Sequence, residues 1–295
     1  MLLTGATGFI GGHLLARLAA DGAEVHAVSR RPPAEHGRAR WHEADLAEVD
    51  AVRRVVSEVS PDLIFHVAGE TRAARDLELV LPAFRSNLVT TVNLLSAAAE
   101  ASPSTRVVLA GSLEEPEAGE PASSPYAASK AAAGLYGRLF GEMFDLRVTA
   151  LRIFMVYGPG QRDLSKLVPH VILSLLRSER PQLTTGQRMI DWIYVDDVVD
   201  AFVAAATHEP VAAAVDVGTG RAVAIRAVVT RLVEMIDATI EPEYGAISDR
   251  PHEQVRVADI AATEQAIGWR PKVELEDGLL RTARWYREQL NLGRL

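Results

Sequence analysis

The chain of 295 residues contains no cysteine, which excludes disulfides, thiolate catalysis and cysteine-ligated metal sites. It also lacks an apolar run of the roughly 20 residues that a membrane-spanning helix needs. Its net charge of −8 provides no general basic field for nucleic acid, so an anionic substrate would need specific arginines. No signal peptide precedes the first predicted strand. We therefore expect a cytoplasmic enzyme with no metal site, no membrane segment and no nucleic-acid partner.

Short β-branched or apolar segments alternate with longer helical patterns through the first half of the chain. The predicted strands are 1–4, 24–28, 63–67, 106–110 and 147–153, and the predicted helices include 10–20 and 46–59. This alternation predicts an α/β fold with a Rossmann-like, doubly wound parallel sheet. We expect a dinucleotide-binding domain over residues 1–155, to which a segment at about 187–215 returns. A smaller, interleaved and mainly substrate-binding C-terminal domain would then cover residues 156–295.

A glycine-rich segment, Thr4-Gly5-Ala6-Thr7-Gly8-Phe9-Ile10-Gly11, joins the first predicted strand to the first predicted helix. Small residues let the backbone approach a pyrophosphate, and the N-terminus of the helix supplies N–H donors and the positive end of its dipole. The alternative is a tight turn between strand and helix that binds nothing. In this context we predict a dinucleotide site whose contacts come from Gly5, Thr7, Gly8, Phe9, Ile10 and Gly11.

The end of the second predicted strand carries no carboxylate. In the NAD-binding version of this fold, an acidic residue about 20 positions beyond the glycine motif binds the ribose hydroxyls. Here Ser29, Arg30 and Arg31 occupy that turn, and their hydroxyl and guanidinium groups suit a 2′-phosphate, unless the two arginines are only a solvated turn. NADP(H) is therefore the predicted cofactor, with NAD(H) as the alternative. Asp45 and Leu46 are placed at the adenine, although Asp45 can equally cap the helix that follows.

A tyrosine and a lysine four residues apart, Tyr126 and Lys130, lie on one face of a predicted helix. A free phenol titrates near pH 10, so a neighbouring ammonium group is needed before the phenol can exchange protons near neutral pH. Ser112 follows a predicted strand, where its hydroxyl can hydrogen-bond a substrate oxygen at the carboxyl edge of the sheet. A Tyr-x-x-x-Lys pair alone is common on exposed helices. Together with the glycine loop, the three residues predict chemistry at a carbon–oxygen bond.

The succession of motifs resembles the extended short-chain dehydrogenase/reductases, the group of nucleotide-sugar epimerases, dehydratases and reductases, over essentially the whole chain. The matching segments are 4–11, Phe65-His66-Val67-Ala68-Gly69, Ser112, Pro125-Tyr126-Ala127-Ala128-Ser129-Lys130, Tyr157-Gly158-Pro159-Gly160-Gln161, Tyr194-Val195-Asp196-Asp197-Val198, Asp216-Val217-Gly218-Thr219-Gly220, Arg250-Pro251 and Gly268-Trp269-Arg270-Pro271.

The resemblance implies a nucleoside diphosphate sugar as the substrate and a homodimer built from helices that flank the active site. It also implies that Ala68 and Gly69 line the cofactor and that Arg250 pairs with the substrate diphosphate. Arg188 is a second candidate for that role, because the family commonly has an arginine where Ile190 stands. The family also usually has asparagine at the position of Met155, so the contacts to the sugar phosphate differ from those common in the family.

The residues after Ser112 bear on the reaction. Dehydratases that resemble this chain carry an acid and a carboxylate at the two next positions, which are Leu113 and Glu114 here, and leucine cannot protonate a leaving hydroxyl. The stretch is similar to the Gly-Ser-Ser-Glu-Glu of nucleotide 4-keto-6-deoxysugar reductases. We therefore predict an NADP(H)-dependent ketoreductase of that substrate class, with Ser112, Tyr126, Lys130 and Glu114 as its catalytic set.

Two alternatives remain open at the level of sequence. An NAD-retaining nucleotide-sugar epimerase or 4,6-dehydratase of the same family would copurify with its cofactor and consume no NADPH. A non-catalytic, NADP-sensing protein would keep the fold without turnover, but such proteins commonly lose the tyrosine or the lysine, and both are present here.

Overall fold

The computed structural model describes residues 1–34, 37–102, 104–117, 119–237, 239–249 and 255–295. Its main element is a seven-stranded sheet in the order β10-β6-β5-β4-β1-β2-β3, and every pairing in it is parallel. The strands are β1 (Leu2–Thr4), β2 (His26–Ser29), β3 (Arg40–Glu43), β4 (Leu63–His66), β5 (Arg106–Ser112), β6 (Arg147–Ile153) and β10 (Val215–Val217). The predicted Rossmann-like, doubly wound α/β fold is confirmed.

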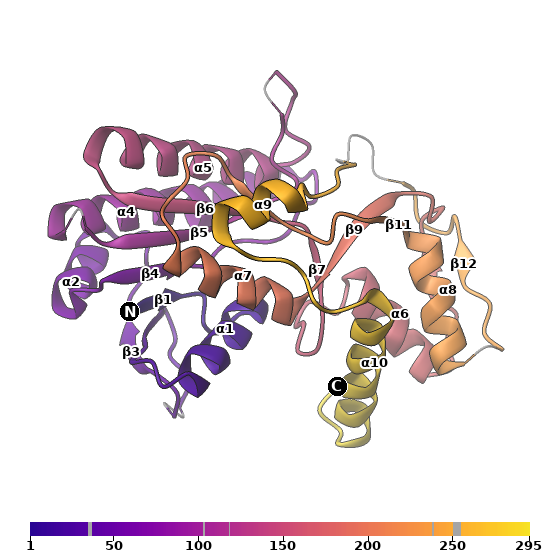
Figure 1. Ribbon diagram of the computed structural model, residues 1–295. Helices are drawn as coiled ribbons and strands as arrows, with labels where there is room; N and C mark the ends of the chain where they lie inside the picture. The colour runs from indigo at the N-terminus through magenta and orange to yellow at the C-terminus, as the bar shows by residue number, and fades with distance from the viewer. Residues whose placement is uncertain (35–36, 103, 118, 238, 250–254) are drawn as a thin grey trace.

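Helices cover both faces of this sheet (Figure 1). On one face α1 (Phe9–Ala20) packs against α7 (Val195–Thr207), and α9 (Ile260–Ile267) lies beside α7 and β10. On the other face α2 (Val49–Val59), α4 (Thr90–Ala101) and α5 (Pro125–Phe144) lie side by side. Each strand serves both layers, because neighbouring residues such as Ile64 and Phe65 point to opposite faces and are buried in different clusters.

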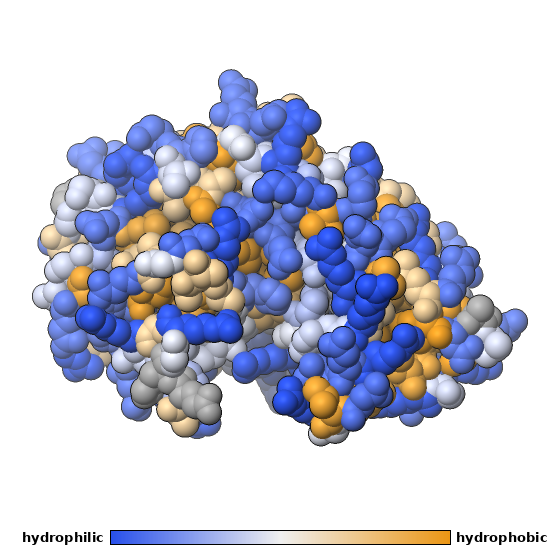
Figure 2. Space-filling model, turned by 60° about the horizontal axis from the view of Figure 1, so that its bottom comes forward, coloured by the Kyte–Doolittle hydropathy of each residue, from blue (hydrophilic) through white to orange (hydrophobic). Residues whose placement is uncertain are grey.

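A second, smaller lobe follows β6. It contains the three-stranded sheet β11-β9-β7 and the pair β12-β8. Its elements are β7 (Met155–Tyr157), α6 (Leu167–Leu176), β8 (Gln182–Leu183), β9 (Met189–Tyr194), β11 (Ala222–Ala224), α8 (Ile225–Ile236), β12 (Glu243–Tyr244) and α10 (Leu275–Asn291). A separate apolar cluster fills this lobe, with Tyr286 fully buried at its centre. The space-filling view shows a mostly hydrophilic face that is hollowed between the two lobes (Figure 2).

Some local predictions differ from the structure. α2 begins at Val49 rather than at residue 46, because the Asp45 side chain accepts from the Ala47 N–H at 3.0 Å and so holds a turn ahead of the helix. The N-cap of α2 is Glu48, so the alternative role of Asp45 as a helix cap is wrong. The domain boundary near residue 155 stays a prediction.

The start of α5 is determined by local sequence. The Ser124 side chain accepts from the Ala127 N–H at 3.1 Å, and Pro125 occupies the first turn, where its missing N–H costs nothing. This places Tyr126 and Lys130 in the first two turns, next to the end of β5. Before α4 the chain passes through η1 (Leu77–Leu79), α3 (Val80–Ala83) and the π-helical η2 (Phe84–Val89). Within the described ranges, no helix combines the length with the apolar character that crossing a membrane requires.

Candidate active site

The glycine loop between β1 and α1 has the geometry of a phosphate cradle. Gly5 has a φ of +75°, and a Cβ there would lie 2.6 Å from the Ala68 nitrogen. A Cβ on Gly11 would lie 2.1 Å from the Gly5 carbonyl oxygen. The Gly8 N–H closes the turn by donating to that carbonyl at 2.8 Å, and no side chain caps α1 at Gly8. The uncapped N–H groups of the first turn are therefore a ready site for an anion.

A chain of hydrogen bonds ties this loop to β4 and α4. The Ala68 N–H donates to Thr4 Oγ1 at 3.2 Å, and Thr4 Oγ1 lies 2.8 Å from His66 Nδ1. On the other side of the ring, Nε2 lies 3.0 Å from Thr91 Oγ1, whose hydroxyl donates to the Asn87 carbonyl at 2.6 Å. Because the Thr91 proton is used there, Nε2 donates and Nδ1 accepts, so the ring is neutral. Burial lowers the pKa of His66 to about 3, and the residue has a structural role.

Asn87 in η2 joins the cofactor side of the site to α5, and the sequence analysis did not find it. Its Nδ2 donates to Ser129 Oγ at 2.8 Å, and its Oδ1 accepts from the Glu70 N–H at 2.8 Å. The Ser129 hydroxyl in turn donates to the Tyr126 carbonyl at 2.8 Å. A Cβ on Gly69 would lie 2.5 Å from Asn87 Oδ1, so only glycine fits there. No local signal marked Asn87, because Arg85 and Ser86 beside it are polar too, and yet it is buried in the structure.

Ser112, Tyr126 and Lys130 come together at the carboxyl end of β5. The Ser112 hydroxyl, at the end of the strand, is hydrogen-bonded to the Tyr126 phenol. Lys130 is 9% exposed, and its Nζ donates to the Ala110 carbonyl at 2.8 Å. Burial raises the pKa of Tyr126 to about 12, although the Ser112 hydrogen bond acts in the opposite direction. Burial also lowers the pKa of Lys130 to about 8. The structure thus brings the predicted catalytic trio into one site.

Glu114 connects this site to the smaller lobe. Its N–H donates to Ser112 Oγ at 3.2 Å, while Oε1 pairs with Arg188 Nη2 at 3.3 Å and Oε2 accepts from Ser123 at 3.3 Å. The Glu114 and Arg188 side chains are 14% and 15% exposed, so the pair is shielded from solvent. Arg188 directly precedes β9, which puts a guanidinium of the smaller lobe beside the catalytic loop.

Arg256 is a second arginine near the catalytic loop, and the sequence analysis missed it. Its Nη1 donates to the Glu115 carbonyl at 2.8 Å. Arg250, predicted to bind the diphosphate, lies outside the described residues. The two departures from the family pattern are both packed in the structure: Ile190 is buried in the smaller lobe, and Met155 packs against the clusters of both lobes.

The end of β2 lies at the same edge of the sheet as the glycine loop, because Thr4 pairs with Val28 in register. Ser29 Oγ accepts from the Arg31 N–H at 3.1 Å, which fixes the turn. Arg30 and Arg31 are exposed, and among the described residues neither forms an ion pair. Both guanidinium groups are therefore available to a ligand at this edge.

The two residues predicted at the adenine have other contacts. Asp45 Oδ2 pairs with Arg85 Nη2 at 3.2 Å. The Leu46 side chain is buried in the core, and its carbonyl accepts from Asn93 at 3.0 Å. These contacts hold the loop after β3 against α4, and any contact with a cofactor would come from the exposed edge of that loop.

Comparison with known proteins agrees with this geometry. The model of the NAD dependent epimerase/dehydratase family matches residues 1–218. The chain belongs to this family. It is 30% identical over 98% of both lengths to a UDP-glucose 4-epimerase of Mycolicibacterium smegmatis. It is 26% identical to a dTDP-D-glucose 4,6-dehydratase of Mus musculus, over 99% of this chain and 89% of the relative.

The fold agrees with solved structures of epimerase/dehydratase family members. A UDP-glucose 4-epimerase of Thermus thermophilus in complex with NAD matches with a TM-score of 0.84 at 28% identity, over 97% of this chain and 98% of that chain. The resemblance to the extended short-chain dehydrogenase/reductases is thereby confirmed, and the chain is an enzyme of that type. The family is NAD-dependent, and the matched residues include the glycine loop, Ser112, Tyr126 and Lys130.

Proposed function

We propose that this enzyme is an NADP(H)-dependent reductase of a nucleoside diphosphate sugar, and specifically a ketoreductase of a nucleotide 4-keto-6-deoxysugar. The observation that carries the proposal is the pair of exposed arginines, Arg30 and Arg31, at the end of β2 beside the glycine loop. A 2′-phosphate bound by Arg30 and Arg31 favours NADP(H), the cofactor generally used for net reduction. The relatives named above support the coarser assignment to nucleotide-sugar chemistry.

The residues present fit a dinucleotide. Glycine at positions 5 and 11 lets the loop pack closely on Ala68 and on the start of α1, because a Cβ at either position would collide with backbone, and the first turn of α1 would hold the pyrophosphate. Ala68 and Gly69 follow β4 at the same edge and would line the cofactor. When bound, the reduced nicotinamide would supply a hydride to the keto carbon.

The catalytic trio supplies the proton. Tyr126 is protonated at neutral pH, since burial raises its pKa to about 12, and it would donate that proton to the oxygen of the reduced carbon. An alkoxide is a stronger base than a phenolate, so this transfer is downhill. Lys130 places a positive charge beside the phenolate that is left, and Ser112 polarises the carbonyl through a hydrogen bond. An enzyme that oxidises its substrate first needs the phenolate at the outset, which the raised pKa disfavours.

Leu113 argues against dehydration. It occupies the position of the acid in the resembling dehydratases, and it is 7% exposed and packed in the core. Glu114 is paired with Arg188, so this carboxylate is held for orientation of substrate hydroxyls. When the substrate binds, Arg188 would pair with its diphosphate together with Arg250.

We also propose that the enzyme is a homodimer. A strip of apolar side chains on α3, η2 and α5, which pack together, is exposed to solvent. Leu81 is 74% exposed and Met143 is 67% exposed, and they are joined by Phe84, Leu135 and Leu139. An apolar strip on adjacent helices is self-complementary under a two-fold axis, which makes a second copy of this chain its occupant.

The second candidate is an NAD-retaining epimerase, favoured by the 30% identity to a UDP-glucose 4-epimerase. The deciding experiment incubates purified protein with NADPH and a panel of nucleotide 4-keto-6-deoxysugars and follows NADPH absorbance. A reductase consumes one NADPH for each sugar converted. Copurified NAD, together with interconversion of UDP-glucose and UDP-galactose and no loss of NADPH, would establish the epimerase instead.

A further inference from the structure

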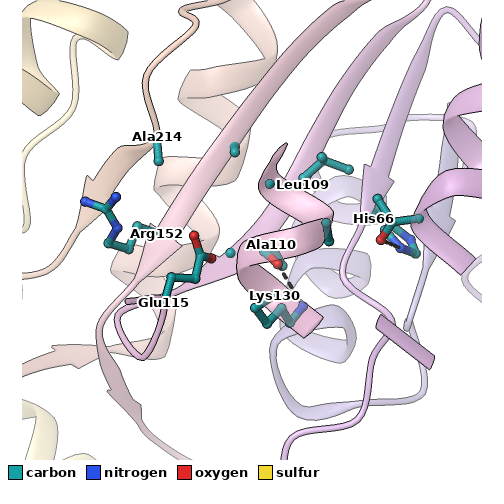
Figure 3. Close-up of a pocket in the computed structure, with 12 residues that line it drawn as sticks. His66, Leu109, Ala110, Glu115, Lys130, Arg152 and Ala214 are labelled. Atoms are coloured by element: carbon teal, nitrogen blue, oxygen red, sulfur yellow. Dashed lines mark hydrogen bonds between the residues drawn. The ribbon is translucent and has the colours of Figure 1, made fainter. Parts of the chain in front are cut away.

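A small internal cavity lies behind Lys130, between α5 and the sheet (Figure 3). Much of its wall is made of small residues, namely Ala110, Gly111, Ala133, Gly134, Ala150 and Ala214. Three charged side chains also line it, those of Glu115, Lys130 and Arg152. Because most of the wall is apolar, charges that face each other across this space interact more strongly than they would in bulk solvent.

Glu115 turns inward to reach this cavity. Its Oε1 accepts from the Ser112 N–H at 2.7 Å, and its own N–H donates to the Ser112 carbonyl at 3.1 Å. A Cβ on Gly111 would lie 2.7 Å from Oε1, and one on Gly134 would lie 3.6 Å from Oε2. The carboxylate therefore occupies space that Gly111 leaves in β5, and it lies beside Gly134 of α5. In Figure 3 its side chain lies between those of Arg152 and Lys130.

The charges alternate across the sheet from the catalytic lysine outward. Gly111, over which the Glu115 carboxylate lies, pairs in register with Arg152 on β6, and Arg152 pairs with Asp216 on β10. Arg152 Nη1 donates to Asp216 Oδ1 at 3.0 Å. The row that runs from Lys130 through Glu115 and Arg152 to Asp216 therefore alternates between positive and negative charge. Each charge thus has an opposite neighbour, which offsets the cost of burial.

We propose that Glu115 is a positioning residue for the reaction: its carboxylate fixes the backbone of Ser112 and is the counter-ion that keeps Lys130 protonated beside Tyr126. The proposal rests on the proposed function, in which those three residues act on the substrate. Glu115 touches neither substrate nor cofactor in this account, and it acts only through Ser112 and Lys130.

The surroundings of Lys130 support this role. Burial lowers the pKa of Lys130, and the charge of Glu115 opposes that change. Among the described residues, the other titratable or charged side chains that face Lys130 are His66 on β4, Arg152 on β6 and Tyr126 on its own helix. His66 is neutral, Tyr126 is protonated and Arg152 is positive, so Glu115 alone in this group supplies a negative charge.

The chain has only three lysines, Lys130, Lys166 and Lys272, so the NMR signal of Lys130 can be followed with little overlap. Protein labelled with ¹³C at the lysine ε-carbon is titrated by NMR without any cofactor or substrate, and the Lys130 signal is assigned with Lys130→Arg. We expect the pKa of Lys130 to be about 8 in the wild type. In Glu115→Gln it should fall by about one unit or more, as for loss of an adjacent opposite charge.

Two variants and a second signal separate the outcomes. Glu117→Gln removes an exposed carboxylate two residues away and should leave the Lys130 titration unchanged, and Glu115→Asp keeps the charge and should leave it close to the wild-type value. In the wild type, the Ser112 amide proton should resonate downfield, because it donates to the Glu115 carboxylate at 2.7 Å, and this measurement needs no folded variant. An unchanged Lys130 titration in Glu115→Gln, or a Ser112 amide proton without the downfield position of a carboxylate-bound N–H, would overturn the proposal.

The assay of NADPH consumption is independent of this titration. Wild-type protein that titrates as expected but reduces no sugar would remove the proposed function and leave the Glu115–Lys130 interaction established. Protein that reduces a sugar while Glu115→Gln leaves both the Lys130 titration and the pH dependence of kcat unchanged would retain the function and remove the role of Glu115.

Discussion

Acid should destabilise this protein through one buried histidine. In the folded chain His66 is neutral, held between Thr4 and Thr91, and its pKa is lowered to about 3, whereas a histidine in the unfolded chain titrates near 6.5. The unfolded state therefore binds a proton that the native state excludes. The contribution of neutral His66 to the free energy of unfolding is present above pH 6.5 and is lost progressively as the pH falls from there towards 3. Linkage gives a loss of about 2 kcal/mol between pH 7 and pH 5 from this group.

Urea denaturation of the wild type and of His66→Gln at pH 7 and pH 5 measures the effect. We expect the variant to be less stable at pH 7, because it loses the imidazole that is hydrogen-bonded to Thr4 and Thr91. The difference in free energy of unfolding between the two proteins should then shrink by about 2 kcal/mol at pH 5, because only the wild type carries the buried imidazole. His208→Gln, at an exposed histidine, is the matched control and should keep the wild-type dependence on pH. A difference that stays constant would mean that native His66 accepts a proton, which would refute the neutral state of the ring in the folded protein.

Three further outcomes follow from the same structure. Replacing Arg30 and Arg31 together by alanine should weaken NADPH binding about 10- to 100-fold and leave NADH binding nearly unchanged, because only charge-assisted contacts to the 2′-phosphate are lost; equal losses for both cofactors in a fluorescence titration would count against the NADP assignment. Gly11→Ala should abolish dinucleotide binding in the same titration, because its Cβ would lie 2.1 Å from a carbonyl oxygen of the loop, whereas Gly12→Ala has its nearest neighbour at 3.6 Å and should bind normally. Met143→Glu should convert a dimer to a monomer in light scattering, and a wild type that is already monomeric would rule out the proposed strip.

Local signals predicted much of the fold and the catalytic trio. The alternation of strands and helices led to the parallel sheet, and the four-residue spacing of Tyr126 and Lys130 placed both on one face of a helix. Ser112 was found because a strand that ends at the carboxyl edge must deliver its next side chains to the site. Each of these features depends on residues close together in sequence or on the direction of parallel strands.

Other features depend on three-dimensional packing and could not be predicted. The Glu114-Glu115 pair has the appearance of a solvated loop, and Glu115 can point inward because Gly111 leaves space for its carboxylate. The pairing of Glu114 with Arg188 joins residues 74 positions apart in two lobes. The role of Asn87 likewise arises from the π-helical turn that presents its amide to three backbone and side-chain partners.

The most direct test of the proposed reduction uses NADPH that carries deuterium at C4 of the nicotinamide, with mass spectrometry of the sugar product. The account predicts one deuterium in the sugar for each NADP⁺ formed, and a loss of turnover of about 10²- to 10⁴-fold in Tyr126→Phe with cofactor binding retained. A sugar that is epimerised or dehydrated without deuterium, by protein that still holds NAD, would contradict it.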